Sequence, residues 1–460
     1  MSHLKFGTDG VRGVANLTLT PELAFKIGRA AGRLLVESGT VKRALVCRDT
    51  RKSGPMIAAG LSSGLCSTGV DVETLGVFPT GGACHLTRCG EYGLGAVVSA
   101  SHNPAPDNGI KLIGPDARKL SSEDEKWIES QLDAPLADPP IGAAVGDLKP
   151  MATAHAVYRE WLMKVVPERL HGLTIAMDCG HGAAYEIAPE VFRGLGATVH
   201  AVGTSPDGSN INAEGGATKP QTIQNWTCET RSDIGIAFDG DADRAVFCDS
   251  QGRLINGDRT MGLWCAHWKP YDRLSPAVVV GTVMSNGGFE TFLKSLGVSV
   301  ERTDVGDKHV SARLSELGGK IGGEQSGHII FPDLLPTGDG LVTALEICRV
   351  LKRDGRPSTC FVDDYDNWPQ CLVNVAVTNK DGWDSDPRLM DSIQSVEADL
   401  AGHGRVNVRA SGTQPMIRIM VEADSVELRD KARDFLVDEF LGVLGGKIYS
   451  QVDLTHALGD

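Results

Sequence analysis

The clearest candidates for chemistry are three carboxylates at alternating positions, in Asp239-Gly240-Asp241-Ala242-Asp243. They follow the apolar run at residues 234–238, which is typical of a buried strand. Carboxylates this close together repel one another unless a cation lies among them, and hard oxygen ligands suit Mg²⁺. The run therefore predicts a magnesium site at the end of a strand.

The run also has other interpretations. An EF-hand loop requires Gly at its sixth position and Glu at its twelfth, where this chain has Arg244 and Ser250, so it is excluded. A nucleophilic Asp239 that forms an aspartyl phosphate stays open as an alternative. A solvated acidic turn is the structural alternative, and the buried strand before it makes that interpretation the weaker one.

A second candidate loop, Ser99-Ala100-Ser101-His102-Asn103-Pro104, follows the strand-like residues 95–98. α/β folds place ligands at the carboxyl ends of strands, and small residues there allow a tight turn that exposes a hydroxyl. Ser101 beside His102 is therefore a candidate nucleophile. On this loop alone, a turn rich in Ser, Asn and Pro without chemistry is the preferred interpretation. The hydrolase pattern G-x-S-x-G does not occur here.

Two further loops combine glycine with polar side chains. In the segment 322–328, GGEQSGH, the glycines permit close approach of a ligand, and Glu324 and Ser326 could bind sugar hydroxyls. In the segment 409–415, RASGTQP, followed by Arg418, two guanidinium groups and two hydroxyls form a candidate phosphate cradle. A Gly-rich turn and a hairpin with surface arginines are the respective structural alternatives. A dinucleotide loop at Gly180-His181-Gly182 is rejected, because the third glycine and the acidic ribose ligand are missing.

Composition excludes several classes of protein. The 460 residues carry a net charge of −14, which argues against non-specific binding to nucleic acid or to a membrane surface. Eleven dispersed cysteines without a CxxC pair lack zinc-site spacing and favour buried free thiols in a reducing compartment. The apolar runs are too short to span a bilayer, and the polar residues 1–13 do not read as a signal peptide. We therefore expect a cytoplasmic protein.

The elements that must position these loops follow a repeated pattern of strand, helix, Gly turn and strand. The strand pairs fall at residues 43–47 and 69–72, 173–177 and 195–199, and 277–280 and 296–300. Such units favour parallel sheets covered by helices. Long insertions separate the three copies, so three related domains are preferred over one large sheet.

Linkers divide the chain into four predicted domains. Breaks are expected in the Pro- and Ala-rich residues 134–150, near residues 250–258 and at residues 363–369. After the break at residues 363–369, the expected order of elements is a strand, a helix, two strands and a helix, which indicates an α+β domain. The predicted fold class is α/β, with three related α/β domains of mixed, mostly parallel sheets and a C-terminal α+β domain. The predicted domains, each with one candidate loop, are residues 1–150, 151–253, 254–368 and 369–460.

In this order the four loops resemble the α-D-phosphohexomutase superfamily. The N-terminal Phe6-Gly7-Thr8-Asp9-Gly10-Val11-Arg12-Gly13 adds a fifth motif, so the resemblance covers nearly the whole chain. It implies four domains around a central cleft and an isomerase that transfers phosphate on a hexose phosphate. A homodimer is suggested by the same resemblance, as is a small-molecule sugar phosphate as the partner.

The resemblance also implies a role for each matching residue. Ser101 carries phosphate, and one Mg²⁺ per site, held by Asp239, Asp241 and Asp243, also touches that phosphate. Sugar hydroxyls bind Glu324 and Ser326, with His328 close by. The other phosphate binds the residues of the cradle, Arg409, Ser411, Gly412, Thr413 and Arg418. The supporting set comprises Arg12, His102, Lys111, Arg244 and Lys308. Lys111 is a candidate general acid/base, provided that cations such as Arg12 lower its pKa.

Within the superfamily, Gln325, residues 6–10 and residues 211–214 are similar to phosphoglucosamine mutases. The implied reaction converts glucosamine 6-phosphate into glucosamine 1-phosphate through a phosphoserine and a 1,6-bisphosphate, for the synthesis of UDP-N-acetylglucosamine. A hexose 1,6-bisphosphate is a candidate activator. Ala242 stands where the metal loop usually has Gly, and every carboxylate of that loop remains. Gln414 stands where the phosphate loop usually has Glu, which leaves that loop less negative and removes no phosphate donor. A phosphomannomutase or phosphoglucomutase is the alternative, and a non-catalytic sugar-phosphate sensor ranks lower.

Overall fold

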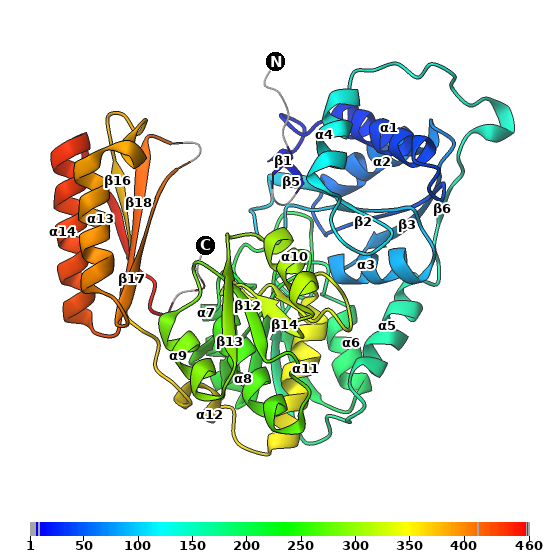
Figure 1. Ribbon diagram of the computed structural model, residues 1–460. Coiled ribbons are helices and arrows are strands. Elements are labelled where there is room, and N and C mark those ends of the chain that lie inside the picture. Colours follow the sequence, from blue (N-terminus) through cyan, green and yellow to red (C-terminus); the bar gives the residue numbers. More distant parts are fainter. Residues whose placement is uncertain (1–5, 8–9, 412–413, 457, 459–460) are drawn as a thin grey trace.

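The computed structural model describes residues 6–7, 10–411, 414–456 and 458 (Figure 1). These residues form four sheets, with six, five, four and four strands, that follow one another along the chain. We call the sheets with their helices domains 1 to 4. Parallel and antiparallel strands occur together in the first three sheets, and the fourth is antiparallel throughout, so the predicted fold class is confirmed.

Domain 1 has the strand order β1-β5-β4-β2-β3-β6. Its strands are β1 (Val11–Val14), β2 (Arg43–Arg48), β3 (Asp71–Val77), β4 (Leu94–Val98), β5 (Asp107–Ile113) and β6 (Leu148–Pro150). Its helices are α1 (Pro21–Glu37), α2 (Gly54–Cys66), α3 (Thr80–Cys89) and α4 (Ser122–Gln131). β2 pairs in parallel with β3 and β4, whereas β5 is antiparallel to both β4 and β1.

Domain 2 has the strand order β11-β10-β9-β7-β8. Its elements are α5 (Ala154–Val165), β7 (Thr174–Asp178), α6 (Ile187–Gly194), β8 (Thr198–Val202), α7 (Gln221–Thr230), β9 (Ile234–Phe238), β10 (Ala245–Asp249) and β11 (Leu254–Ile255). Because β11 pairs with β10, this sheet extends two residues past the predicted boundary at residue 253. The four boundaries themselves stay a prediction.

Domain 3 has the strand order β13-β12-β14-β15. Its elements are α8 (Gly257–Trp268), β12 (Val278–Thr282), α9 (Gly287–Ser295), β13 (Ser299–Thr303), α10 (Asp307–Leu317), β14 (Ile321–Gly323), β15 (Ile329–Ile330), α11 (Gly340–Asp354) and α12 (Cys360–Asp363). β12 pairs in parallel with β13 and β14, and β15 returns antiparallel to β14.

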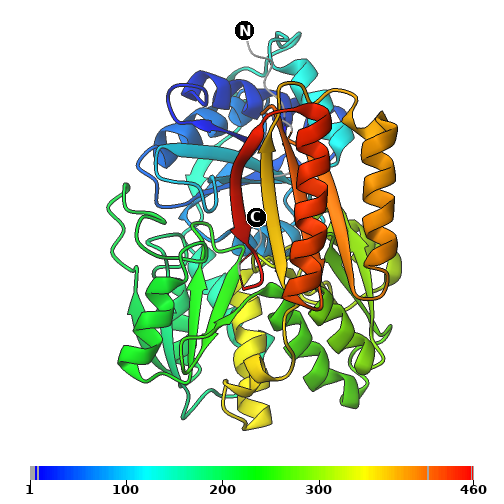
Figure 2. The ribbon, with the colours of Figure 1, turned by 90° about the vertical axis from the view of Figure 1, so that its left-hand side faces the viewer.

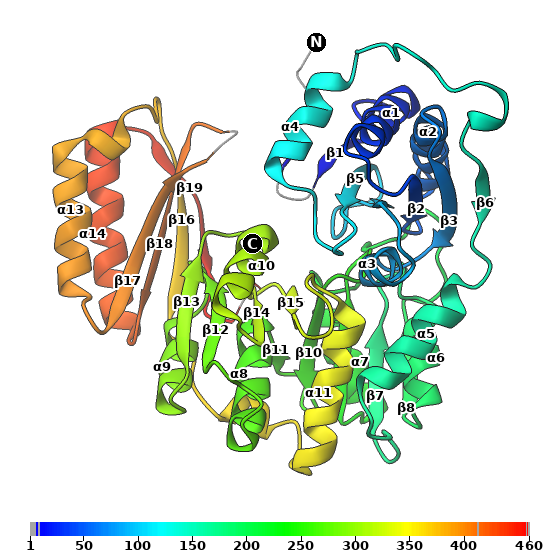
Figure 3. The same cartoon turned by 45° about the vertical axis from the view of Figure 1, so that its right-hand side comes forward.

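One connectivity, shared by these three domains, positions three of the candidate loops (Figure 3). In each domain a strand, a helix and a parallel strand are followed by a second helix and a third parallel strand, which an antiparallel strand follows. The units are β2-α2-β3-α3-β4-β5, β7-α6-β8-α7-β9-β10 and β12-α9-β13-α10-β14-β15. The candidate loop in each case leaves the carboxyl end of the third strand, where α/β sheets bind ligands.

A shared apolar core holds domains 1 to 3 together. The same buried cluster contains Leu45 and Phe78 of domain 1, Phe238 of domain 2, and Phe289 and Leu345 of domain 3. β4, β9 and β12 are buried along their whole length, which explains their continuous apolar sequences. The packing of this core, rather than the linkers, therefore sets how the candidate loops face one another.

Domain 4 has its own core and an antiparallel sheet of order β17-β18-β16-β19. Its elements are β16 (Gln370–Ala376), α13 (Pro387–Asp399), β17 (Gly404–Ala410), β18 (Met416–Ala423), α14 (Val426–Leu444) and β19 (Lys447–Asp453). The first five match the predicted order, whereas β19 was not predicted. Figures 1 and 2 show α13 and α14 covering the sheet face that is turned away from the other domains.

Two further expectations concern the chain as a whole. All eleven cysteines carry free thiols, and eight of them are buried, as the composition predicted. Among the residues that the structure describes, no helix combines the length and the apolar character needed to cross a bilayer.

Candidate active site

The Ser101 loop and the Asp239 loop meet between domains 1 and 2. Ser101 is only 1% exposed, and its Oγ donates a hydrogen bond of 2.5 Å to Asp239 Oδ2. His102 Nδ1 lies 3.5 Å from the same Oγ. The backbone of Ser101 has a φ of +52°, in the left-handed region that residues with a side chain adopt at a cost. A strained serine aimed at a carboxylate cluster is a feature of functional sites rather than of ordinary turns.

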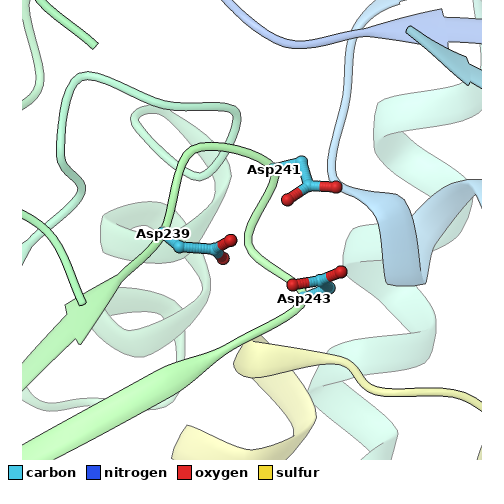
Figure 4. A group of neighbouring side chains, drawn as sticks. All are labelled: Asp239, Asp241 and Asp243. Atoms are coloured by element: carbon cyan, nitrogen blue, oxygen red, sulfur yellow. The ribbon is translucent and has the colours of Figure 1, made fainter. Parts of the chain in front are cut away.

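The three aspartates lie on the turn between β9 and β10 (Figure 4). All three are buried, and one oxygen from each carboxylate lies within 4.8 Å of the others. Asp241 Oδ1 and Asp243 Oδ1 are buried and accept no hydrogen bond within the described part of the chain. Buried acceptors normally have partners. Convergent, underused carboxylate oxygens therefore fit a hard divalent cation.

Charge is distributed unevenly over this cluster. Burial raises the pKa of Asp239 well above its usual range, and the carboxylates of Asp243 and Asp241 add to the rise. Burial acts in the same direction on Asp243, but the Lys111 ammonium and the His328 imidazole outweigh it and hold its pKa well below the usual range. Of these two carboxylates, Asp239 is thus the one that nearby positive charge compensates less. A cation bound beside Asp239 and the serine hydroxyl would favour its ionised form.

Lys111 lies on β5 and is almost completely buried. Its Nζ donates hydrogen bonds to Asp241 Oδ2 at 2.7 Å and to Asp243 Oδ2 at 2.8 Å. Arg12, a cation expected near Lys111, lies on the adjacent strand β1, opposite Gly109 of β5. Two carboxylates flank the ammonium group of Lys111 and compensate its charge. This position suits a counter-ion of the metal loop.

The predicted sugar loop of domain 3 reaches the metal loop through His328. His328 is 4% exposed, with Nδ1 3.7 Å from Asp243 Oδ1 and Nε2 3.7 Å from Asp307 Oδ2. Burial works to lower the pKa of His328, but the neighbouring carboxylate of Asp243, with the charges of Asp307 and Glu324, raises it. Glu324 Oε1 accepts a hydrogen bond of 3.0 Å from the Gly306 amide.

Lys308 faces domain 1 rather than the aspartates. Its Nζ lies 2.6 Å from Glu125 Oε2 on α4, and the preceding residue Asp307 pairs with Lys119 at 2.6 Å. Lys119, Asp307 and Lys308 border a cavity of about 200 Å³ between domains 1 and 3. Lys308 therefore lies at the edge of the site and is already engaged by a carboxylate.

The predicted phosphate cradle occupies the hairpin of β17 and β18. Arg409 and Arg418 are directly opposite each other on the two strands. Burial, followed by the charge of Arg418, lowers the pKa of Arg409. Like charges at opposed positions destabilise a sheet unless an anion lies between them. The Lys380 ammonium also donates to the Ser411 carbonyl, which adds a third cation that the sequence did not reveal.

Two members of the predicted cradle, Gly412 and Thr413, lie outside the described residues. A second cavity, of about 450 Å³, is lined by residues of domains 2, 3 and 4, among them Arg244, Ser326 and Leu372. Within the described residues, no hydrogen bond joins Arg409, Ser411 or Arg418 to the Ser101 loop or the three aspartates.

Sequence reasoning missed two residues that hold the Ser101 loop. Arg51 is fully buried, and its Nη2 donates to the carbonyls of Ser101 and Asn103 at 3.0 and 2.7 Å. Asn212 Nδ2 donates to the same two carbonyls at 2.9 and 3.2 Å. The available signal was the polar run Asp49-Thr50-Arg51, directly after a buried strand. Asn212 falls within residues 211–214, whose sequence resembles that of phosphoglucosamine mutases but does not by itself indicate a contact with Ser101.

Comparison with known families finds matches to one family along most of the chain. Four models of the phosphoglucomutase/phosphomannomutase family match: alpha/beta/alpha domain I at residues 3–137, domain II at residues 155–252, domain III at residues 256–367 and the C-terminal domain at residues 372–439. Each model matches the greater part of one of the four sheets, and together the models account for most of the chain.

Individual relatives and a solved structure also resemble this chain over most of its length. A phosphoglucosamine mutase of Symbiobacterium thermophilum is 46% identical, covering 91% of this chain and 94% of its own length. One of Geobacillus thermodenitrificans is 44% identical, covering 92% and 95%. A phosphoglucomutase/phosphomannomutase family protein of Burkholderia thailandensis shares the fold, with a TM-score of 0.81 at 24% identity, covering 97% of this chain and 98% of that one.

Proposed function

Since this chain belongs to the phosphoglucomutase/phosphomannomutase family, we propose that it is an isomerase that interconverts glucosamine 6-phosphate and glucosamine 1-phosphate. The observation that carries the proposal is the hydroxyl of Ser101, 2.5 Å from Asp239 beside a buried carboxylate cluster. Curated relatives that are 42–46% identical over most of this chain are phosphoglucosamine mutases.

Ser101 is the proposed carrier of phosphate. In one half-reaction the phosphoryl group leaves Ser101 Oγ and bonds to sugar O1, whose proton passes to a base. The resulting 1,6-bisphosphate then returns its 6-phosphoryl group to Ser101 Oγ, and sugar O6 takes up a proton. His102, 3.5 Å from Oγ, and Lys111 are the proposed groups for these proton transfers.

Asp239, Asp241 and Asp243 are proposed to hold one Mg²⁺ per site, together with the phosphate on Ser101. Hard carboxylate ligands favour this cation. When bound, it would neutralise charge on the transferring phosphoryl group, which is the main requirement of phosphoryl transfer. Lys111 neutralises the far side of the same cluster through Asp241 and Asp243.

The substrate is proposed to span the domains. Glu324, Ser326 and His328 would bind sugar hydroxyls, with Arg12, Arg244 and Lys308 supporting the reacting end. The phosphate that is not reacting would bind Arg409, Ser411, Gly412, Thr413 and Arg418. Opening of domain 4, which has its own core, is proposed to let the bisphosphate reorient without leaving the protein.

Gln325 supports the amino sugar over its neutral analogues. Its side chain is buried, and neither its Oε1 nor its Nε2 has a hydrogen-bond partner within the described residues. Such a buried amide is costly unless a ligand satisfies it. The charged amino group of the sugar would donate a charge-assisted hydrogen bond to Oε1, which is stronger than the one that a hydroxyl could donate.

The wider setting of the protein is also a proposal. Its product would supply UDP-N-acetylglucosamine synthesis, and a hexose 1,6-bisphosphate would restore phosphate to Ser101 after loss. A cytoplasmic location suits eleven free thiols. A homodimer is proposed from the family resemblance.

The test is a coupled assay on purified protein with Mg²⁺ and a trace of glucose 1,6-bisphosphate. Glucosamine 6-phosphate, glucose 1-phosphate and mannose 1-phosphate are compared by kcat/KM. Preference for the amino sugar supports the proposal. Preference for glucose or mannose assigns the chain to the alternative, a phosphoglucomutase or phosphomannomutase, and no turnover of any sugar contradicts catalysis altogether.

A further inference from the structure

We infer that Arg51 and Asn212 form a two-sided clamp that holds the Ser101 loop in the orientation required for phosphoryl transfer. Both are positioning residues, because they contact the backbone of the loop and not the reacting oxygen. The inference rests on the proposed role of Ser101 as the phosphate carrier. It assigns a function to two buried polar side chains that the mechanism above does not use.

The clamp acts where the loop is least able to hold itself. Ser101 has a left-handed φ of +52°, and its carbonyl and that of Asn103 lie beyond the end of β4, outside the sheet ladder. Each of these two carbonyls accepts one hydrogen bond from Arg51 Nη2 and one from Asn212 Nδ2. Four hydrogen bonds thus oppose the strain of the serine backbone.

Arg51 provides the half of the clamp that belongs to domain 1. Its Nε forms a buried ion pair of 2.9 Å with Asp49 Oδ2, and its Nη1 donates to the Pro104 carbonyl at 2.5 Å. Asp49 Oδ2 also accepts a hydrogen bond of 2.5 Å from Ser99 Oγ, which in turn accepts one of 2.9 Å from the Ser101 amide. The serine is therefore held through both its carbonyl and its amide.

Asn212 provides the half that belongs to domain 2. It is 5% exposed, has a φ of +55°, and its amide donates to the Gly180 carbonyl at 2.9 Å. It lies close to the metal loop, because a Cβ at Gly240 would be 2.5 Å from the Ser101 carbonyl and 2.9 Å from Asn212 Nδ2. Gly240 is thus required for the approach of the two loops.

The arrangement couples two loops that must act together. Ser101 belongs to domain 1 and the aspartates belong to domain 2. The distance between them therefore depends on the relative position of the two domains. Asn212 fixes the serine loop directly to domain 2, within reach of Gly240 of the metal loop. A displacement of a reacting group by about 1 Å can reduce a rate by roughly 100-fold. We therefore expect loss of the clamp to slow transfer without weakening substrate binding.

Asn212→Gly is the sharpest variant, because glycine accepts the left-handed backbone and only the side chain is lost. Asn16→Gly is the matched control: Asn16 also has a positive φ, of +63°, but is exposed on a turn. Steady-state kcat and KM, the rate of Ser101 phosphorylation by glucose 1,6-bisphosphate, and Tm are measured for both variants and for the unmodified protein.

The expected result for Asn212→Gly is a fall of about 10- to 100-fold in kcat and in the rate of Ser101 phosphorylation, with KM within about twofold. Asn16→Gly should match the unmodified protein in kcat, KM and phosphorylation rate. Arg51→Lys keeps the positive charge beside Asp49 but loses the planar fork, so its kcat should fall at least as far.

Two results would overturn the clamp while leaving the proposed function intact. One is an Asn212→Gly protein with unchanged kcat. The other is an activity loss that merely follows the fraction of unfolded protein, with normal kcat per folded molecule. If the unmodified protein turns over no sugar phosphate, the proposed function fails instead, and the two failures are thereby distinguished.

Discussion

Ser101 Oγ and Asp239 Oδ2 are 2.5 Å apart, although 138 positions separate the two residues in the sequence. Each follows the third parallel strand of its domain, β4 in one case and β9 in the other. The repeated connectivity therefore brings two equivalent loops face to face, one with a hydroxyl and one with three carboxylates.

Asp241→Asn should weaken metal binding and activity. The change removes one negative charge from the cluster but preserves the shape of the side chain, to which Thr80 Oγ1 now donates at 2.6 Å. Since even residues behind metal ligands alter affinity or activity by 10- to 100-fold, we expect a loss of kcat of more than about 100-fold at low Mg²⁺. Activity titrated against Mg²⁺ concentration is the measurement.

Asp249→Asn is the control for this prediction. Asp249 is equally buried in domain 2, but it pairs with Arg253 at 2.7 Å, on the strand that leads away from the cluster. Its loss should lower Tm and leave the Mg²⁺ dependence unchanged. Equal Mg²⁺ dependence in both variants would show that Asp241 is not a ligand.

Arg409→Ala should weaken binding of the sugar phosphate without lowering the thermal stability of the protein. Arg409 and Arg418 are opposed on β17 and β18, so removing one relieves repulsion, and Tm should not fall. A charge-assisted hydrogen bond contributes about 1.5–3 kcal/mol, so KM for the sugar phosphate should rise by roughly 10- to 100-fold. Arg433→Ala, on α14 of the same domain, is the control and should leave KM unchanged. An unaltered KM in Arg409→Ala would refute the phosphate cradle.

Gln325→Leu should reduce discrimination between sugars. The buried amide lacks protein partners within the described residues, so an apolar side chain of similar size should maintain or raise Tm. The ratio of kcat/KM for glucosamine 6-phosphate over glucose 6-phosphate should fall by about 10-fold, since one hydrogen bond to the ligand is lost. A lower Tm with an unchanged ratio would make Gln325 a structural residue only.

Asp258 should make stability depend on pH. Burial raises the pKa of Asp258 from 3.8 to about 6, against the lowering effects of the Asn286 amide and Arg302, and Glu422 adds to the rise. A carboxyl with a raised pKa in the folded state contributes stability below its unfolded pKa, and this contribution is lost as pH rises through about 6. The contribution of this group therefore disappears between about pH 4 and pH 6.

Asp258→Asn tests this sign. The neutral amide keeps an acceptor for the Asn286 N–H and does not titrate. Relative to the unmodified protein, the variant should gain up to about 3 kcal/mol between pH 4 and pH 7, at 1.36 kcal/mol for each unit of pKa shift. Tm of both proteins, measured across this range, should diverge in favour of the variant as pH rises. A constant difference in Tm would contradict the raised pKa.

Local pattern was sufficient to predict the strands and most of the chemistry. The apolar run before Asp239 predicted a buried strand, β9, and the alternating carboxylates after it predicted a cation site whose three members the structure brings together. The three strand pairs of the repeat are all present as parallel neighbours. These features depend on residues close in sequence, and local periodicity reports them.

Local periodicity could not predict the features that depend on packing between domains. The carboxylate partners of Lys111 come from a loop 130 residues away, so the sequence around Lys111 did not reveal them. Asn212 lies in a long loop without periodicity, and its contact with Ser101 depends on how the shared core registers two domains. β19 is an exposed edge strand with little apolar alternation, and it therefore lacks the usual signal.

The most direct test of the account follows phosphate on the protein itself. Protein is labelled with glucose 1,6-bisphosphate that carries ³²P, freed of excess label, and mixed with unlabelled glucosamine 6-phosphate. The account predicts acid-stable label at Ser101 that leaves the protein with the sugar within a single turnover, and no label on Ser101→Ala. Label on Ser101→Ala, or an acid-labile label at Asp239, would contradict Ser101 as the carrier of phosphate.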